Sequence, residues 1–257
     1  MRLLTIPISH YCEKARWALE RAGIAYREER HVQGLHQLYA RRAGGGDTVP
    51  VLVGPEEVLG DSDQILEWVD ERTPPEHRLY PAEPRARAEV QRLCRRLDSE
   101  LGPRARRLMY VHMLAERDLM LRFNNAGVPR WEDRMIRIGW PLVWPYARRR
   151  LSIEPGVDAE DEVAVWRELD FVAGLMADGR PHLAGERFGA ADLTFASLAA
   201  AVLVPPIYGT PLPQPELLPA RTAALVERAR AHPAGRYAMG VIESRRRAVV
   251  PRPDATG

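Results

Sequence analysis

The chain is poor in lysine, and this scarcity bears on its partners. Lys14 is the only lysine among 37 basic residues, so nearly all of the positive charge comes from arginine. Such a bias indicates a G+C-rich genome rather than a basic binding surface. We therefore expect the arginine runs at 148–150 and 245–247 to be solvated helix ends, where cations suit the helix dipole. The net charge of +2 gives no argument for a nucleic-acid or anionic-membrane partner.

Cysteines and long apolar runs are also scarce. The two cysteines, Cys12 and Cys94, lie 82 residues apart (94 − 12), which does not make a disulfide framework. No apolar run reaches the roughly 18 residues of a membrane span. The first residues enter an apolar run at 3–6 without the pattern of a secretory signal. We expect a cytoplasmic protein whose thiols stay reduced.

The first 73 residues alternate between strand and helix patterns. Apolar runs at 3–6, 49–53 and 58–59 have the length of strands, and another strand begins at 24–26. Helical periodicity marks 12–22 and 62–71, and a shorter helix is expected at 33–42. Gly23 suits the end of the first helix, because glycine accepts the left-handed cap conformation. The order βαβαββα predicts an α/β thioredoxin-like N-terminal domain over 1–73.

The remainder of the chain is expected to be helical. Prolines at both ends of 74–84 predict a linker, because proline neither continues a helix nor donates to a sheet. Residues 85–257 then form an all-α helical bundle, in which 192–203 is apolar all round and predicts a central helix. Within the bundle, the break at 124–129 and the Trp140-Pro141 and Trp144-Pro145 pairs predict an irregular insertion over 115–153. Such a segment could cover an interface between subunits or wall off a ligand pocket, and we favour the pocket.

Three short motifs in the first domain point to a ligand. Ser9 stands at the start of a helix, where unpaired N–H groups and the positive end of the dipole favour an anion. Val49-Pro50 is an X-Pro bond, which can be cis at modest cost and turn the Val49 backbone toward a ligand. Asp61 and Ser62 open another helix and offer N–H donors to a carboxylate. The set is suited to a thiol tripeptide.

These motifs resemble those of the cytosolic, bacterial-type glutathione transferases. Thr48-Val49-Pro50, the segment Asp61-Ser62-Asp63-Gln64-Ile65-Leu66 and the bundle segment from Leu183 to Asp192 stand where that family has motifs. The segment from Ser9 to Arg16 resembles the serine/cysteine branch. The resemblance covers nearly the whole chain.

The resemblance implies a function and its participants. Glutathione would be the co-substrate, another low-molecular-weight thiol being possible, and it would be conjugated to a small hydrophobic electrophile. Val49 would pair its backbone with the cysteinyl part of the tripeptide. Ser62 would hold the γ-glutamyl carboxylate, and Asp61 or its neighbours would meet the α-amino group. The helical domain would form the electrophile site, and relatives of this type are commonly homodimers.

The catalytic group has three candidates. Ser9 could donate its O–H to the thiolate sulfur, although it could also serve only as a helix cap. Cys12 could act as a redox thiol, which would make the protein a thiol–disulfide oxidoreductase or deglutathionylase. Tyr11 could reach the sulfur with its phenol. A noncatalytic ligand-binding member of the fold is the third functional alternative.

Other conspicuous residues are assigned structural roles. Gly189 and Asp192 resemble a capping box in which glycine replaces the hydroxyl residue, so the Asp192 carboxylate is expected to accept from the Gly189 N–H. Cys94 falls on an apolar helical stripe and is expected in the core. No metal is expected, because His31 and His36 are five residues apart and no cysteine or histidine cluster accompanies them. His10, beside Ser9, could contact a ligand.

Overall fold

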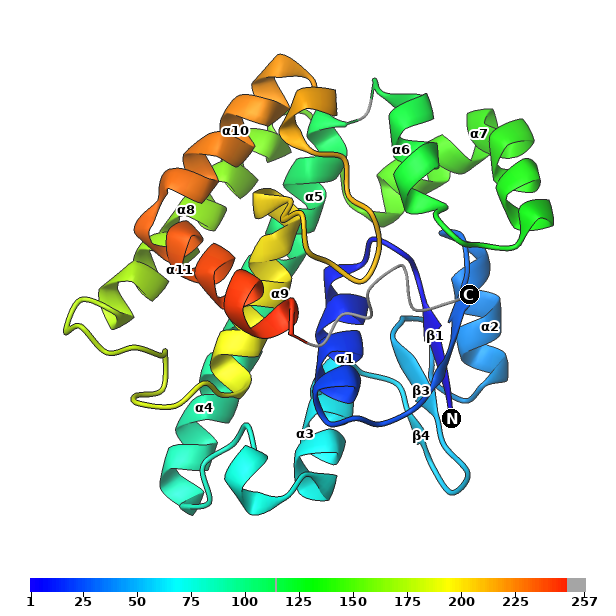
Figure 1. The fold of residues 1–257 in the computed structure, drawn as a ribbon. Coiled ribbons are helices and arrows are strands. Elements are labelled where there is room, and N and C mark those ends of the chain that lie inside the picture. The colour runs from blue at the N-terminus through cyan, green and yellow to red at the C-terminus, as the bar shows by residue number, and fades with distance from the viewer. Residues whose placement is uncertain (114, 249–257) are drawn as a thin grey trace.

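The computed structural model describes residues 1–113 and 115–248. An α/β domain at the N-terminus packs beside a larger helical region, and the blue-to-cyan and green-to-red parts of the ribbon separate clearly (Figure 1). Within the described residues, no helix is both long and apolar enough to cross a membrane. The predicted pairing of a thioredoxin-like domain with a helical region is confirmed.

The N-terminal domain is built on a mixed sheet of the order β2-β1-β3-β4. Strand β1 is parallel to β2 and antiparallel to β3, with Leu3 opposite both Glu28 and Leu52. The element order is the predicted βαβαββα, although the second strand begins at Arg27 rather than at 24. The elements are β1 (Arg2–Thr5), α1 (His10–Arg21), β2 (Arg27–Arg30), α2 (Leu35–Arg42), β3 (Val51–Val53), β4 (Val58–Leu59) and α3 (Ser62–Arg72).

Helix α1 joins the two parts of the molecule. Its apolar residues Ala15, Ala18 and Leu19 are fully buried, and the helix packs against α3 on one side and α9 on the other. Gly23 has φ of +67°, the left-handed conformation that the sequence predicted after this helix. Because α1 is packed on both sides, the loop before it has a fixed position relative to both domains.

The helical region surrounds a central buried helix, α9. Nearly every residue of α9 is buried, as its continuous apolar sequence predicted. It ends where Val204 adopts a φ of +45° and Pro205 follows, since proline cannot continue a helix. The region comprises η1 (Pro75–His77), α4 (Pro84–Arg96), the π turn η2 (Leu97–Leu101), α5 (Gly102–His112), α6 (Arg117–Asn124), α7 (Arg130–Arg150), α8 (Val157–Leu175), α9 (Ala190–Leu203), η3 (Pro215–Leu217), α10 (Ala220–Ala231), α11 (Pro233–Val241) and the π turn η4 (Ile242–Arg246).

The prediction of an irregular insertion over 115–153 is wrong. The segment forms α6 and α7, and α7 continues through both Pro141 and Pro145. A proline inside a helix leaves the carbonyl four residues earlier without its usual donor. Here the Arg117 guanidinium donates to the Arg137 carbonyl at 2.8 Å and so replaces the N–H that Pro141 lacks. A side chain from α6 thus compensates one of the two prolines.

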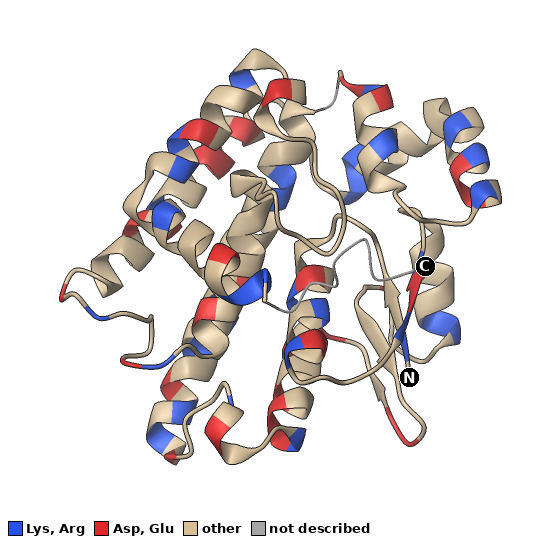
Figure 2. Ribbon diagram, in the orientation of Figure 1, with Lys and Arg blue, Asp and Glu red and all other residues tan. Residues whose placement is uncertain are grey.

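The arginine runs behave differently from one another. Charges of both signs are interspersed along the helices (Figure 2), and Arg148, Arg149 and Arg150 are exposed as expected. In the second run Arg245 and Arg247 are also exposed, but Arg246 is buried, which corrects the prediction at that residue. Its guanidinium donates to Glu13 at 2.7 Å and also pairs with Glu20, both on α1. The end of the described chain is therefore fastened to the N-terminal domain through buried charge.

Candidate functional site

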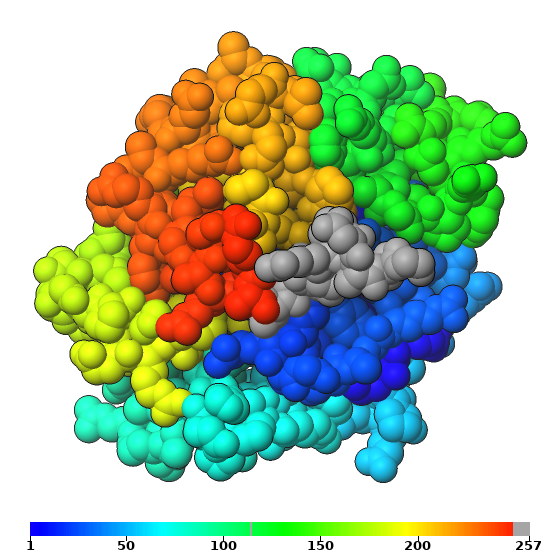
Figure 3. Space-filling view, in the orientation of Figure 1, coloured from blue at the N-terminus to red at the C-terminus, as the bar shows by residue number. Residues whose placement is uncertain are grey.

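A cavity of about 630 Å³ lies between the two domains. In the space-filling view, the green segment containing α6 and α7 meets the blue N-terminal domain along one boundary (Figure 3). Residues from α5, α6, α7 and the loop after α9 form the wall opposite the N-terminal domain. That wall is largely apolar and includes Met109, Met113, Leu119, Met120, Phe123 and Leu212. Such a concave, mostly apolar cavity is typical of a small-molecule site.

Ser9 lies at the cavity wall and caps α1. Its Oγ accepts a hydrogen bond from the Cys12 backbone N–H at 3.3 Å, and Ser9 itself lines the cavity. A hydroxyl that accepts through a lone pair still has its own hydrogen to donate. Capping and ligand contact are therefore compatible at this residue, next to the positive end of the α1 dipole.

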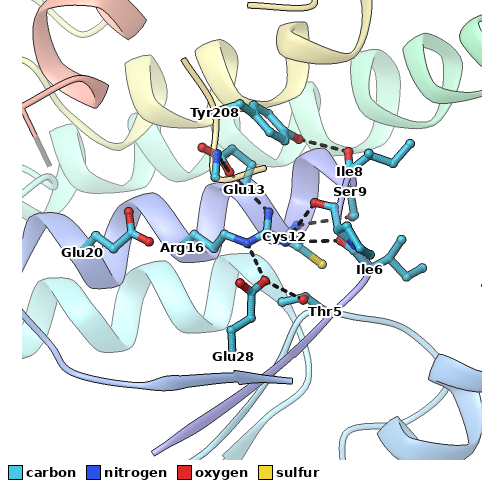
Figure 4. Close-up of polar contacts among 12 residues, drawn as sticks. Thr5, Ile6, Ile8, Ser9, Cys12, Glu13, Arg16, Glu20, Glu28 and Tyr208 are labelled. Carbon is cyan, nitrogen blue, oxygen red and sulfur yellow. Dashed lines mark hydrogen bonds and ion pairs between the residues drawn. The ribbon is translucent and has the colours of Figure 1, made fainter. Parts of the chain in front are cut away.

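A buried charge network fixes the loop that carries Ser9 (Figure 4). The Arg16 guanidinium donates to the Pro7 carbonyl at 2.9 Å and pairs with Glu28 at 2.7 Å. The Tyr208 hydroxyl donates to the Ile8 carbonyl at 3.1 Å. The backbone on the approach to Ser9 is thus held by side chains from α1 and from the loop after α9.

Cys12 lies beneath Ser9 and away from the cavity. Its side chain is fully buried, and it is absent from the cavity lining. Burial raises the pKa of the Cys12 thiol, because a thiolate is poorly solvated there. Cys94 is also buried, as expected of a core thiol, and accepts a contact from the Thr194 hydroxyl at 3.6 Å.

Tyr11 and His10 form part of the cavity wall. The Tyr11 hydroxyl donates to the Asp98 carbonyl at 2.7 Å, and burial raises the pKa of this phenol. The imidazole of His10 is buried, which lowers its pKa to about 3 and keeps it neutral. Within the described residues, His10 Nε2 has no hydrogen-bond partner. The Tyr11 hydroxyl is therefore already hydrogen-bonded to the π turn between α4 and α5, whereas Nε2 of His10 has no partner among the described residues.

The other predicted ligand contacts divide into two groups. The Val49–Pro50 bond is cis, and Thr48 and Val49 line the cavity together with Ser9. Pro50 itself is buried. Asp61 caps α3 by accepting from the Asp63 N–H at 2.7 Å, and Ser62 is 3% exposed; neither lines the cavity. The structure thus brings Ser9 and Val49 to one cavity and leaves the start of α3 outside it.

Lys14 is a residue of the site region that the sequence reasoning did not assign. This lysine is fully buried on α1, where its ammonium group donates to Asp98 at 2.8 Å and also pairs with Asp63. Burial raises the pKa of the Asp98 carboxyl to about 7, against the opposing attraction of the Lys14 ammonium. The triad joins α1, the start of α3 and the π turn whose Asp98 carbonyl receives Tyr11. The only signal in the sequence was the presence of a single lysine among so many arginines.

Gly189 and Asp192 take part in the fold rather than in the cavity. The Asp192 carboxylate accepts from the Gly189 N–H at 2.7 Å and from the Leu183 N–H at 2.8 Å, and the Tyr237 hydroxyl also donates to it. These bonds satisfy the N-terminus of the central helix α9. In the described ranges no group of three or more histidine, cysteine or acidic residues is arranged to hold a metal ion.

Comparisons with known proteins agree on one family. Residues 3–77 match the family model of the glutathione S-transferase N-terminal domain. A solved glutathione S-transferase from Xanthobacter autotrophicus Py2 is 17% identical with a TM-score of 0.62, over 95% of this chain and 92% of its own. A Tau-class enzyme from mango, Mangifera indica, is 15% identical with a TM-score of 0.61, over 98% and 92% of the two chains.

A third similar structure was solved with a ligand bound. A theta-class glutathione S-transferase from Xanthomonas axonopodis pv. citri, solved with glutathione bound, is 21% identical with a TM-score of 0.56, over 93% and 96% of the two chains. No curated protein sequence matches this chain. At such identities, the solved structures show the fold. The chain therefore has the fold of the glutathione S-transferases, and its residues 3–77 match the family model of their N-terminal domain.

Proposed function

We propose that this protein is a glutathione transferase that conjugates the tripeptide to a hydrophobic electrophile. One observation carries the proposal: Ser9, at the N-terminus of α1, and Val49, before a cis-proline, line the same cavity as an apolar wall from the helical region. Binding of both reactants in that cavity would place sulfur and electrophile together, which converts a bimolecular reaction into an effectively unimolecular one. The glutathione bound to the theta-class relative supports the choice of thiol.

Ser9 is the proposed catalytic residue, as in the serine branch of the family. Its O–H would donate to the thiolate sulfur, and the α1 dipole would add positive potential, so that the bound thiol ionises more readily. The thiol proton passes to solvent, and the sulfur lone pair forms a C–S bond to the electrophilic carbon. The displaced electron pair leaves with the leaving group or, in an addition, is protonated by solvent. Val49 would pair with the cysteinyl backbone.

Asp61 and Ser62 are proposed for the γ-glutamyl end of glutathione. Their support is the resemblance and their place at the start of α3, where backbone N–H groups favour a carboxylate. Because these residues lie outside the cavity that Ser9 and Val49 line, the proposal separates the two ends of the tripeptide. The sulfur end lies in the cavity, and the γ-glutamyl end lies toward α3.

The test compares wild type with Ser9→Ala, using glutathione and the neutral acceptor 1-chloro-2,4-dinitrobenzene. We expect kcat/KM to fall about 100-fold, the size of effect reported when a donor to a developing anion is removed. Ser9→Thr keeps the hydroxyl and should restore turnover, whereas Ser9→Asp keeps only the cap acceptor and should not. Thiolate absorbance of bound glutathione during a pH titration provides a second readout. Equal turnover in Ser9→Ala and wild type would exclude the role of Ser9.

The alternative functions predict different results. Buried Cys12, with its raised pKa, is poorly suited to redox work, so oxidised glutathione should add no mass to the intact protein. A mass adduct at Cys12 would favour the oxidoreductase instead. A noncatalytic ligand carrier would show thermal stabilisation by glutathione without turnover of any acceptor. Repeating the assay with other low-molecular-weight thiols identifies the thiol that is used.

We also propose a homodimer in the cytoplasm. The dimer rests on the resemblance and on the preference of soluble oligomers for closed twofold symmetry. The reducing location is supported by Cys12 and Cys94, which are both free thiols. Light scattering at micromolar concentration tests the assembly. A mass near the 29.0 kDa of one chain would overturn the dimer.

A further inference from the structure

Two arginines that line the cavity have no carboxylate partner in the part of the chain that the structure describes. Arg106 projects from α5 and Arg150 from the C-terminal end of α7, and both contribute to the cavity wall. Neither forms an ion pair within residues 1–113 and 115–248, although ion pairs are common elsewhere in the molecule. For Arg106, the Nε atom is buried and has no acceptor among these residues. A buried guanidinium donor without an acceptor is costly, so it favours a ligand that supplies one.

No other group in the described cavity wall forms an ion pair with these cations, although the charge of Arg150 contributes to lowering the pKa of the Asp47 carboxyl. Asp47 is the one acidic residue of that lining, and its carboxylate pairs with Arg41, which is exposed and does not line the cavity. The imidazoles His10 and His36 also line the cavity. Burial lowers the pKa of His10 to about 3 and that of His36 to about 4, so both are neutral.

The neighbouring arginines contribute to the same shifts. The charge of Arg106 lowers the pKa of both histidines, and the charge of Arg150 lowers that of His36, so both cations contribute positive potential on the side of the cavity where these imidazoles lie. A neutral electrophile would leave this positive potential unused. An anionic group would gain from it more strongly than in water, because the apolar surroundings screen charge poorly.

We propose that the second substrate is an amphipathic anion, an apolar electrophile that carries a carboxylate or sulfonate. The anion binds the guanidinium of Arg106, the apolar body packs on the methionines and Phe123 of the same helical wall, and Arg150 adds attraction at α7. The planar fork of Arg106 matches two carboxylate oxygens. The role of the anion as a substrate rests on the proposed function, whereas its binding beside Arg106 does not.

The kinetic test uses a matched pair of acceptors, 4-chloro-3-nitrobenzoate and its methyl ester, which differ in one negative charge. The readout is the ratio of kcat/KM for the acid to that for the ester. We expect Arg106→Gln to lower this ratio about tenfold or more, the effect of losing a charge-assisted hydrogen bond. Arg150→Gln should lower it less, because Arg150 is exposed and more strongly screened. The control Arg149→Gln removes an exposed neighbouring charge and should leave the ratio unchanged.

Binding without turnover separates this inference from the proposed function. Fluorescence titration with 8-anilinonaphthalene-1-sulfonate and with neutral N-phenyl-1-naphthylamine measures anion preference directly. The sulfonate should bind about tenfold more weakly to Arg106→Gln, relative to the neutral probe. If neither acceptor reacts, the proposed function fails, while the probes still decide the anion site. An unchanged probe ratio overturns the inference.

The carboxylates of glutathione are the other source of the same chemistry. Thermal-shift titration with glutathione identifies it: if Arg106→Gln weakens glutathione and leaves both ratios unchanged, Arg106 serves the tripeptide and the inference is wrong. Arg106→Lys keeps the charge without the bidentate fork and should give intermediate ratios. This variant also keeps the test decisive if Arg106→Gln fails to fold.

Discussion

The two walls of the cavity are built by different means. On the N-terminal side, the backbone before Ser9 is held by buried polar contacts from Arg16 and Tyr208. On the helical side, methionines and Phe123 form the surface. A rigid wall suits a ligand of constant structure, such as a tripeptide, whereas unbranched methionine side chains adapt to ligands of varied shape. Under the proposed function, glutathione would lie against the N-terminal wall and the more variable electrophile against the helical wall.

The two sides of the cavity also differ in whether their cationic side chains have carboxylate partners. On the N-terminal side, buried Lys14 and Arg16 each contact two carboxylates. On the helical side, Arg106 contacts none within the described residues. Paired charges fix a structure, while an unpartnered charge is available for a ligand. The paired charges of Lys14 and Arg16 hold the N-terminal side in place, whereas the charge of Arg106 is available to bind the anion proposed above.

The largest effect is expected from breaking the fixed wall. Arg16→Met should lower the free energy of unfolding by about 3–5 kcal/mol, because it removes a buried cation that contacts both Glu13 and Glu28 and leaves each carboxylate with a single arginine partner. On the helical wall, Met120→Leu conserves volume and should cost less than about 1.5 kcal/mol. Urea unfolding measures both. The exposed control Glu89→Ala should change stability by less than about 1 kcal/mol. Equal costs for the first two variants would contradict the contrast between the walls.

The structure of the N-terminal side, the fixed wall, could be predicted from the sequence better than that of the helical side, the adaptable wall. Local signals sufficed for the strands, for α1 with its glycine stop and for α9, because periodicity and cap chemistry act within a few residues. The path of α7 was missed, since compensation for Pro141 comes from Arg117, whose guanidinium contacts the Arg137 carbonyl from 20 residues earlier in the chain. Buried Arg246 was missed for the same reason: its partners lie on α1, more than 200 residues earlier. Long-range partners cannot be read from local pattern.

The residues of the candidate site also differ in whether local sequence could predict their positions. The position of Ser9 and Val49 at a possible ligand site could be predicted because it follows from a helix start and an X-Pro bond, and both residues line the cavity. Arg106 gave no signal in a chain so rich in arginine, and only the structure shows that it faces a cavity. Asp61 and Ser62 could be placed on a helix start from sequence, but their distance from the cavity could not. Sequence thus identified backbone features and missed the side chains that converge from separate elements.

An intermediate effect is expected at the joint between the walls, where Gly102 of α5 meets Tyr11 of α1. A Cβ at Gly102 would clash with the Tyr11 hydroxyl oxygen, so Gly102→Ala must displace the phenol from the Asp98 carbonyl. We expect a loss of about 1–3 kcal/mol in unfolding free energy. The matched control is Gly174→Ala on α8, where nothing lies within 4 Å of the added carbon. Its stability should equal or slightly exceed that of wild type. A loss of the same size in both variants would show that the joint is not tight.

The smallest effect concerns the contribution of His10 to the pH dependence of stability. His10 lies in the N-terminal wall, and the charges of Arg106 and Lys14 add to the lowering of its pKa. Its pKa is lowered from 6.5 to about 3, chiefly by burial, so the folded state keeps the imidazole neutral while the unfolded chain takes up a proton below pH 6.5. Between these two values the unfolded state binds more protons, and stability therefore falls as the pH falls. We expect His10 to cost roughly 1 kcal/mol between about pH 7 and about pH 5.5.

The variant His10→Phe keeps an aromatic ring beside Tyr11 but cannot take up a proton, so its stability should fall less over the same pH range. Urea unfolding at each pH gives the two slopes, and the informative quantity is their difference, because the other titrating groups are common to both proteins. The control His77→Gln changes an exposed histidine and should keep the wild-type slope. Parallel slopes for wild type and His10→Phe would mean that His10 is hydrated or protonated when folded. The fixed wall would then be open to water at the position beside Ser9, and the contrast with the adaptable wall would be lost there.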